Sequence, residues 1–531
     1  MECTTADARE LNYIESLLRV RQAVAAERLA RDLTERCDTV EAHILLGRAL
    51  QQQGRIEGAL QAADTARSRA SGHPGATLLA IECLLQTENY HRGIDELRSL
   101  ELSSRNNGRL LQDIGNLYSH LNLHQDAERC YGRAAGLAPG DSRALYNWAT
   151  CLTALGRLEA AEQTLDRVVS LAPEDHDAYY NRSTLRRQTL ECNHVPELQS
   201  ALSMASSPAE RVALGYALAK ELEDLGRWPE SFAALRTAAD TRRRVLSYRV
   251  EHDVATMTQI AWTFDADYCR PAARAGFESR RPIFIVGLPR SGTTLVDRIL
   301  SSHSQIESRG ESSDLALALM RLAGLASDRS TLVQRAAKLD PRELGRSFCA
   351  RLPRTGAARV IDKTPLNFLY LGLVAAALPQ ATLIHVRRAP LDVCYAMYKT
   401  LFRMAYPFSY DLSDLASYYP AYSALMQHWR NALGARLIEV DYETLVADQE
   451  QTTRRLLDAC GLPWEDACLE FHRNESPSLT ASAAQVRQPL YNSSVDSWRR
   501  YERELQPLVD GLRARGVSLA SLAQQTSFAA A

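Results

Sequence analysis

The residues best suited to chemistry form a glycine-bounded loop in the second half of the chain. The loop covers 287–294, with the sequence GLPRSGTT, and it follows the apolar run 283–286. The segment after it repeats apolar residues at helical spacing, beginning at Leu295. A loop between a strand and a helix exposes backbone N–H groups, and the helix N-terminus adds positive potential. The sequence therefore predicts a phosphate-binding loop.

This loop lacks the lysine of an ordinary NTPase phosphate loop. Thr293 stands where the pattern GxxxxGK[ST] has its lysine, and Arg290 is the one cation in the loop. An ATPase or a small-molecule kinase is therefore disfavoured, because the lysine contact to the β- and γ-phosphates is missing. The residues predicted to bind the donor here are Pro289, Arg290, Ser291, Gly292, Thr293 and Thr294.

A second basic segment, HVRRAPLD at 385–392, covers the end of another apolar run. A guanidinium can make a bidentate, charge-assisted contact with a phosphate, which makes Arg388 a candidate ligand. The alternative is that Arg387 and Arg388 are a solvated pair at a strand end. His385, inside the apolar run, is predicted to be a core histidine.

These two segments resemble those of the PAPS-dependent sulfotransferases, whose donor is 3′-phosphoadenosine 5′-phosphosulfate (PAPS). PRSGTT is similar to the family's 5′-phosphosulfate loop. The other segment resembles the 3′-phosphate motif, in which Arg-x-Pro-x-Asp is followed by a serine eight positions after the arginine. Arg388, Pro390 and Asp392 match this motif, but Ala396 replaces the serine and removes one hydroxyl donor.

The resemblance extends over about 281–510 and implies further roles. Glu311 follows a glycine, as does the base of tyrosylprotein-type sulfotransferases, and Lys363 matches the lysine that contacts the transferring group. An element near the adenosine is implied at Tyr442. A late loop that closes over the nucleotide is implied at Arg487, Tyr491 and Ser494, and we call it the late loop below. Repeats ahead of such a domain resemble bacterial tetratricopeptide-repeat (TPR) sulfotransferases, and this likeness covers nearly the whole chain.

The implied reaction is an in-line displacement at sulfur, in which catalysis is mostly positioning and charge stabilisation. Arg290, Lys363 and the loop N–H groups would meet the negative charge that grows as PAP leaves. Glu311 would take the proton of the acceptor hydroxyl, and a phenol suits a carboxylate base better than an alkanol. Cationic side chains would replace Mg²⁺, so we expect no metal.

Simpler interpretations stay open for several of these residues. Glu311 could be a surface or helix-capping carboxylate, Lys363 a solvated lysine, and Asp362 its local ion-pair partner. The aromatic residues of 398–422 could wall the acceptor pocket or pack between helices.

Short apolar runs separated by helical stretches must position these groups. The runs are 283–286, 360–361, 383–386 and 437–440, and 367–378 is one helical stretch. Strands alternating with helices indicate βαβ units, a parallel sheet and a ligand site at the C-terminal ends of the strands. The predicted second domain is therefore an α/β, phosphate-loop-type sulfotransferase domain.

The first half of the chain repeats every 34 residues. Pro139 and Pro173 are one period apart, and Gly54 and Gly156 are three periods apart. This period is typical of TPR helix pairs. The copies are 40–73, 74–107, 108–140, 141–175 and, after a slip in register, 210–240, with a capping pair at 7–36. We predict an all-α solenoid over 1–250, a linker over 251–280, the sulfotransferase domain over 281–515 and a tail over 516–531.

Composition favours a cytoplasmic protein. The formal charge of −2 from 62 basic and 64 acidic residues favours neither nucleic acid nor an anionic membrane. The eleven cysteines show no metal-type spacing, and no run is long enough for a membrane helix. The N-terminus lacks the pattern of a signal peptide.

Two functions follow from the sequence. The first is a sulfotransferase that acts on a hydroxyl, such as that of tyrosine or another phenol, on a peptide bound by the concave face of the repeats. The second is a TPR adaptor whose transferase domain binds nucleotide without turnover. The repeats could also only support the second domain or make a dimer.

Overall fold

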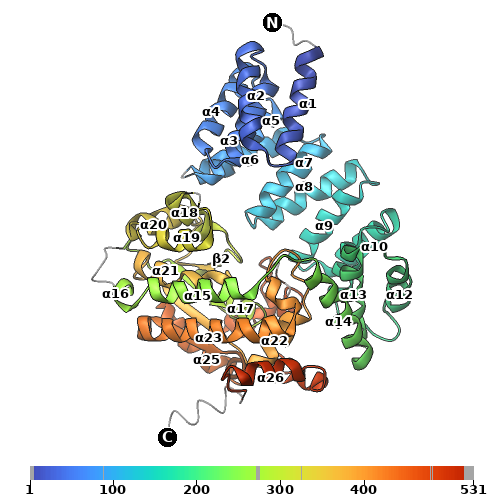
Figure 1. The fold of residues 1–531 in the computed structure, drawn as a ribbon, viewed down its shortest axis with the longest axis vertical. Coiled ribbons are helices and arrows are strands. Elements are labelled where there is room, and N and C mark those ends of the chain that lie inside the picture. The colour runs from blue at the N-terminus through green and yellow to red at the C-terminus, as the bar shows by residue number, and fades with distance from the viewer. Residues whose placement is uncertain are drawn as a thin grey trace. The chain divides into compact units, whose positions relative to one another are not determined.

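The chain divides into two compact units, Met1–Ala138 and Pro139–Ala531. A computed structural model describes residues 5–87, 89–270, 276–324, 326–478, 480 and 482–519 (Figure 1). Part of the predicted linker, 271–275, and most of the predicted tail, 520–531, lie outside the described residues. Within the described part, no helix combines the length and apolarity that crossing a bilayer requires.

The first unit is a stack of antiparallel helix pairs. A left-handed residue turns the chain within several pairs, such as Gly54 at φ 73° between α3 and α4. Buried alanines, among them Ala59 at 0% exposure, let the helices approach closely. The helices are α1 (Thr5–Arg19), α2 (Ala23–Arg36), α3 (Val40–Gln52), α4 (Ile56–Arg69), α5 (Pro74–Gln86), α6 (Tyr90–Ser103), α7 (Gly108–His120) and α8 (His124–Leu137). The predicted repeat fold is confirmed.

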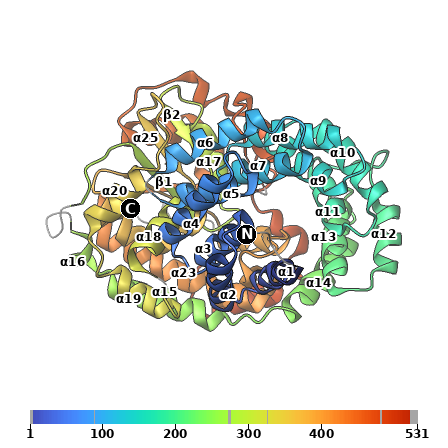
Figure 2. The same ribbon diagram turned by 90° about the horizontal axis from the view of Figure 1, so that it is seen from above.

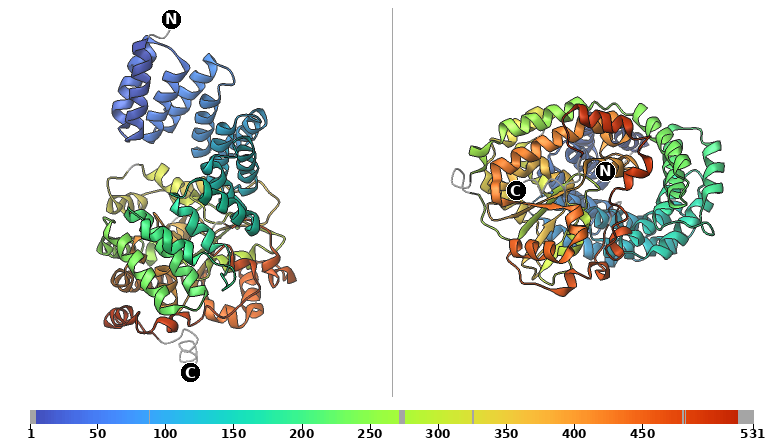
Figure 3. Two further views of the ribbon diagram at one scale, coloured as in Figure 1. Left: turned by 90° about the vertical axis from the view of Figure 1, so that its right-hand side faces the viewer. Right: turned by 90° about the horizontal axis from the view of Figure 1, so that it is seen from below.

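Further repeat helices belong to the second unit. They are α9 (Ser142–Ala154), α10 (Leu158–Leu171), α11 (His176–Thr184), α12 (Val195–Met204), α13 (Pro208–Asp224) and α14 (Trp228–Arg244). Gly156 and Gly226, at φ 75° and 74°, make the same turn as Gly54. Figure 2 and Figure 3 show these helices curving along one side of the second unit.

These later repeats share a hydrophobic core with the α/β part of the unit. Phe232 of α14 packs against Tyr398 and Tyr501, with ring centroids 6.1 and 5.4 Å apart. The Tyr216 hydroxyl of α13 donates a hydrogen bond to the carbonyl of Tyr398. The predicted division at residue 250 stays a prediction, whereas the contacts divide the chain after Ala138.

Five parallel strands form the sheet, in the order β2-β3-β1-β4-β5. They are β1 (Pro282–Gly287), β2 (Ile306–Ser308), β3 (Arg359–Asp362), β4 (Thr382–Arg387) and β5 (Leu437–Asp441). The four predicted runs lie in β1, β3, β4 and β5, which confirms the parallel-sheet fold. Sequence patterning misses β2 because this three-residue edge strand contains one apolar residue, Ile306.

Helices cover both faces of the sheet, which explains why β1 is apolar throughout. Ile283 and Ile285 face a core shared with α17 (Thr293–Leu300) and α25 (Gln449–Cys460). Phe284 and Val286 face the larger core, with α21 (Leu371–Ala377), α22 (Pro390–Tyr398) and α23 (Leu412–Leu433). The remaining α-helices are α15 (Val250–Thr263), α16 (Ala266–Cys269), α18 (Asp314–Ala323), α19 (Arg329–Ala336), α20 (Pro341–Cys349), α24 (Tyr442–Ala447) and α26 (Gln506–Ala514).

Short 3-10 helices lie between these elements. They cover Pro365–Tyr370, Pro407–Tyr410, Gly434–Arg436, Asp466–Cys468, Phe471–Arg473, Gln485–Arg487 and Ser497–Tyr501. The predicted helical stretch 367–378 thus divides into a 3-10 turn and α21.

Candidate active site

The predicted phosphate loop connects β1 to α17 at the C-terminal edge of the sheet. Gly292 caps α17 at φ 104°, where a Cβ atom would lie 2.6 Å from the Tyr442 ring. Only glycine fits there, because the conformation is left-handed and the ring of α24 closes the space. The first turn of α17 leaves backbone N–H groups without helical partners, at the positive end of the helix. The local fold therefore favours an anion at this turn.

Two arginines meet over this loop. One terminal nitrogen of Arg388 donates to the carbonyl of Arg290 at 3.0 Å, and the other to the carbonyl of Ser494 at 2.6 Å. The guanidinium of Arg388 lies over the Tyr442 ring, 4.7 Å from its centroid. Arg290 donates to Ser482 and, at 3.0 Å, to Gln485. The late loop and the phosphate loop thus hold each other through side chains that the sequence predicts to bind the donor.

The two guanidinium groups retain unused capacity to bind an anion. The Nε atoms of Arg290 and Arg388 are both buried and have no hydrogen-bond partner among the described residues. Burial lowers the pKa of Arg290, and the neighbouring charge of Arg388 lowers it further. Like charges held together in a buried place favour an anionic ligand. This feature fits the predicted binding of a phosphosulfate.

Asp392 of the second motif anchors the late loop. Its carboxylate accepts hydrogen bonds from the backbone N–H of Asp496 at 2.8 Å and from the Ser497 hydroxyl at 3.3 Å. Ala396 follows one turn later on α22 and is 5% exposed. The helix thus fixes the loop at its first turn and presents a methyl group at its second.

A cavity of about 640 Å³ lies between the phosphate loop, the late loop and the repeat helices, and we name it the donor cavity. Of the residues predicted to bind the donor, those that line it are Arg290, Gly292, Thr293, Thr294, Arg388, Tyr442, Tyr491 and Ser494. Pro289, Ser291 and Arg487 do not line this cavity. Arg487 instead donates to the carbonyl of Ala154 in α9 at 2.8 Å, and a contact of these three with the donor stays a prediction.

Glu311 and Lys363 meet beyond the ends of two neighbouring strands. The backbone N–H of Lys363 donates to the carbonyl of Gly310 at 2.9 Å, and the Ser312 N–H donates to the Thr364 hydroxyl at 3.0 Å. These bonds continue the pairing of β2 with β3. The Nζ atom of Lys363 lies 2.7 Å from Oε1 of Glu311, and the exposed side-chain fractions are 1% for the lysine and 47% for the glutamate.

Glu311 lines a second cavity, of about 540 Å³, which we name the acceptor cavity. Pro365 and Tyr406 belong to its catalytic-domain wall, and Tyr180 and Asn181 of α11 belong to its repeat wall. The residues that it shares with the donor cavity include Arg290, Thr293, Thr294, Lys220 and Lys399. The two cavities therefore meet at the phosphate loop, and Glu311 lines the acceptor cavity without lining the donor cavity.

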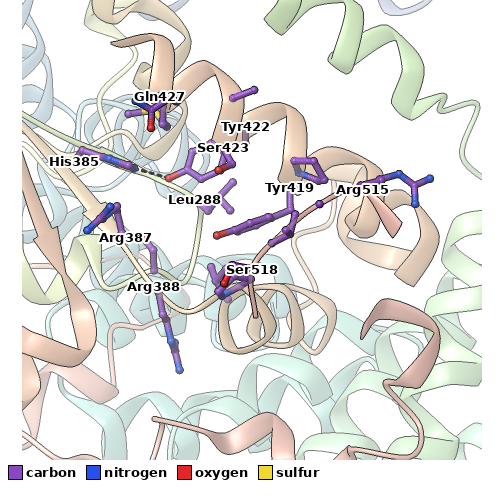
Figure 4. A pocket seen from close by; sticks show the side chains of 18 of the residues that line it. Leu288, His385, Arg387, Arg388, Tyr419, Tyr422, Ser423, Gln427, Arg515 and Ser518 are labelled. Atoms are coloured by element: carbon purple, nitrogen blue, oxygen red, sulfur yellow. Dashed lines mark hydrogen bonds between the residues drawn. The ribbon is translucent and has the colours of Figure 1, made fainter. Parts of the chain in front are cut away.

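A third cavity, of about 420 Å³, lies beside β4 (Figure 4). Figure 4 shows the side chains of Arg387 and Arg388 pointing apart. Arg387 forms an ion pair with Asp441. Ser291 of the phosphate loop lines this third cavity. The adjacent arginines therefore have different surroundings.

His385 is a buried histidine of the core. Its ring nitrogens lie 3.1 Å from Oε1 of Glu439 and 2.6 Å from the Tyr422 hydroxyl. Burial lowers the pKa of His385, which favours the neutral imidazole. This is the role expected from the sequence.

The aromatic residues of 398–422 divide between a cavity wall and the core, and a role in binding the acceptor stays a prediction. Tyr406 lines the acceptor cavity. Phe408 stacks on Tyr418 with ring centroids 3.5 Å apart, and Tyr410 and Tyr422 are buried in the larger core. Phe402 and Tyr406 therefore line this cavity, whereas Phe408, Tyr410, Tyr418 and Tyr422 pack in the core.

Comparison with known proteins identifies the families that parts of this chain match. Residues 282–466 match the model of the sulfotransferase family, and 44–106 and 121–183 match tetratricopeptide-repeat models. The chain carries a sulfotransferase-family domain together with TPR repeats.

Several proteins resemble this chain. An uncharacterized protein of Aquifex aeolicus is 31% identical over 333 residues, which cover 60% of this chain and 44% of that protein. A protein-tyrosine sulfotransferase of Drosophila melanogaster is 26% identical over 241 residues, which cover 41% of this chain and 46% of that protein. The matches thus span less than half the length of these two relatives.

Solved structures resemble each part of the chain separately. The sulfotransferase domain of the Synechococcus PCC 7002 olefin synthase has a TM-score of 0.30 at 23% identity and covers 42% of this chain and 89% of that one. A TPR protein of Thermus thermophilus has a TM-score of 0.28 at 22% identity and covers 34% of this chain and 97% of that one.

Sequence reasoning missed the contribution of the repeats to the walls of both cavities of the sulfotransferase domain. Lys220 of α13 and Arg187, just after α11, line the donor cavity. The nine-residue α11 and the segment before α13 cover the stretch in which the 34-residue register slips. The loss of the 34-residue period was therefore the sequence signal available for the contribution of these helices to the cavity walls.

Proposed function

We propose that this chain transfers the sulfuryl group of PAPS to a hydroxyl acceptor and releases PAP. The observation that carries the proposal is the junction of the two cavities at Arg290, Thr293 and Thr294, with Glu311 lining only the acceptor cavity. A transfer reaction needs this arrangement, because the donor and the acceptor must approach one anion-binding loop from different sides.

The cations of the loop would stabilise the transferring group. Arg290 and the N–H groups at the start of α17 bind the phosphosulfate, and Arg388 holds the nucleotide through its unpartnered Nε donor. As the bond between sulfur and the bridging oxygen breaks, negative charge grows on that oxygen. Preorganised donors in a buried site stabilise this charge without reorganisation.

Glu311 would act on the acceptor. The acceptor oxygen forms a bond to sulfur, its proton passes to the Glu311 carboxylate, and PAP leaves with the bridging oxygen. In this proposal Lys363, held 2.7 Å from Glu311, orients the carboxylate, and its positive charge stabilises the transferring group, although its side chain lines neither cavity. The half-exposed Glu311 side chain allows a hydroxyl to reach it.

A tyrosine or another phenol is the acceptor class that we propose. The pKa of a phenol is near 10, which makes proton transfer to a carboxylate easier than from an alkanol. The name of the Drosophila relative, a protein-tyrosine sulfotransferase, supports this class. In this proposal a peptide carrying the phenol binds to the TPR repeats, as peptides bind to other solenoids.

Single-turnover transfer from labelled PAPS to a simple phenol tests the proposal. We expect label on the phenol and stoichiometric PAP. Binding of PAP without transfer to the phenol or to any protein of a cell lysate would favour the adaptor function instead. Absence of PAP binding would contradict both functions.

A further inference from the structure

The donor cavity carries far more positive charge than its phosphate loop supplies. Seven cationic side chains line it, against the two carboxylates of Glu223 and Asp224. The seven are Arg186, Arg187, Lys220, Arg290, Arg388, Lys399 and Arg500. A phosphate monoester carries about −1.5 to −2 charges near pH 7. The excess of cations therefore fits a ligand with a second anionic group beyond the one at the phosphate loop.

Part of this charge comes from the repeats and faces the helix that lacks the expected hydroxyl. Lys399, three residues after Ala396 on α22, lies 2.9 Å from Glu223 of α13. Lys220, also on α13, contacts Asp224 at 2.7 Å and donates to the carbonyl of Arg186. The Lys399–Glu223 pair joins the C-terminal end of α22 to α13, and Lys220 of the repeats lines the same cavity as Ala396.

Two arginines that line this cavity differ from the lysines in having no carboxylate partner among the residues that the structure describes. Arg187 is exposed and lines the donor cavity from the loop after α11. Arg500 lies over the Trp228 ring of α14, 5.0 Å from its centroid. Arg186, by contrast, is engaged by Glu162 at 2.9 Å. Arg187 therefore keeps its full charge available for a ligand.

We propose that Arg187, from the loop after α11, and Lys220 of α13 bind the 3′-phosphate of the nucleotide in place of the hydroxyl that Ala396 lacks. This inference rests on the proposed function and adds that the repeats are part of the donor site. A guanidinium and an ammonium supply stronger, charge-assisted contacts to a phosphate than one serine hydroxyl. The nucleotide would then be held at one pole by the sulfotransferase domain and at the other by the repeats.

Titration calorimetry of the full chain with PAP and with AMP isolates the contribution of the 3′-phosphate. Both ligands share the adenosine and the 5′-phosphate. The dissociation constant of AMP divided by that of PAP therefore reports the contribution of the 3′-phosphate alone. We expect Arg187→Ala and Lys220→Met each to reduce this ratio by about 10- to 100-fold, the worth of one charged hydrogen bond. AMP affinity should stay nearly unchanged in both variants, which shows that the fold and the phosphate loop are intact.

The exposed Arg236 of α14, which lines neither cavity, gives a matched control in Arg236→Ala. A ratio in both variants equal to that of the control overturns the inference while leaving the proposed function intact. A ratio near one in the unsubstituted chain contradicts the donor itself. If Lys220→Met weakens AMP as well, Arg187→Ala, whose side chain is exposed, decides the outcome alone.

Discussion

The Nζ atom of Lys363 lies 2.7 Å from Oε1 of Glu311, so the two groups proposed for leaving-group stabilisation and for proton transfer touch each other. Lys363 is almost fully buried, and a buried ammonium needs a carboxylate or several acceptors near it. The pairing fixes the Glu311 carboxylate at the edge of the acceptor cavity. In the proposed mechanism, the chemistry therefore depends on both residues together.

Replacing Glu311 by Gln should lower the single-turnover rate of phenol sulfation by about 10²- to 10⁴-fold, the usual worth of a positioned base. The affinity for PAP should barely change, because Glu311 does not line the donor cavity. The control is Glu307→Gln on β2, which accepts a hydrogen bond from Thr355 and lines neither cavity. An undiminished rate at saturating PAPS would remove Glu311 from the mechanism.

Arg388→Ala should weaken PAP binding by about 1.5–3 kcal/mol, the worth of a hydrogen bond to a charged group. Arg387→Ala should leave PAP binding unchanged, because Arg387 pairs with Asp441 and does not line the donor cavity. Calorimetry on both variants below their unfolding temperatures checks this. Equal losses from the two substitutions would contradict the assignment of Arg388 as the ligand.

The stability of the protein should fall with rising pH through Asp362. Burial raises the pKa of Asp362 to about 7, above the value of ~3.9 in an unfolded chain. The native state therefore binds the proton more tightly, so this contribution is fully present below about pH 4 and is lost as the pH rises to about 7.

Asp362→Asn removes this titration and keeps an oxygen acceptor for the Thr364 N–H and the Asn367 amide. Its unfolding temperature relative to the native chain should rise between about pH 4 and pH 7 and level off above that. Thermal unfolding at several pH values measures this difference. A difference that does not vary with pH would show that Asp362 is ionised in the folded protein throughout.

Removal of residues 1–138, the first compact unit, should reduce transfer to a protein acceptor far more than transfer to a simple phenol. The reason is that the reacting groups line cavities within the second unit, whereas a solenoid offers an extended surface for a longer ligand. PAP binding and thermal unfolding establish that the remaining chain is folded. Equal losses for both acceptors would assign the first unit a supporting role.

The sequence was sufficient to predict the repeats and the sheet because both have short-range signals. The 34-residue period repeats Gly54 at Gly156, and β1 is a continuous apolar run next to a glycine-rich loop. The sequence predicted a role for Glu311 and another for Lys363 but not the contact between them. The two residues are 52 positions apart and meet through strand pairing. β2 and the wall formed by Arg187 and Lys220 depend on tertiary packing, which no local pattern encodes.

The late loop and the segment before it contact the repeat helix α9. The backbone N–H of Ser478 and the guanidinium of Arg487 both donate to the carbonyl of Ala154, and a Cβ atom on Gly156 would collide with that guanidinium. The turn between α9 and α10 is therefore constrained twice, once by its own repeat and once by the loop that borders the donor cavity. In evolutionary terms this repeat is only partly interchangeable: a copy that keeps a glycine at this turn, as at Gly54, leaves room for the Arg487 guanidinium, whereas the copy with Asn122 at the equivalent turn does not.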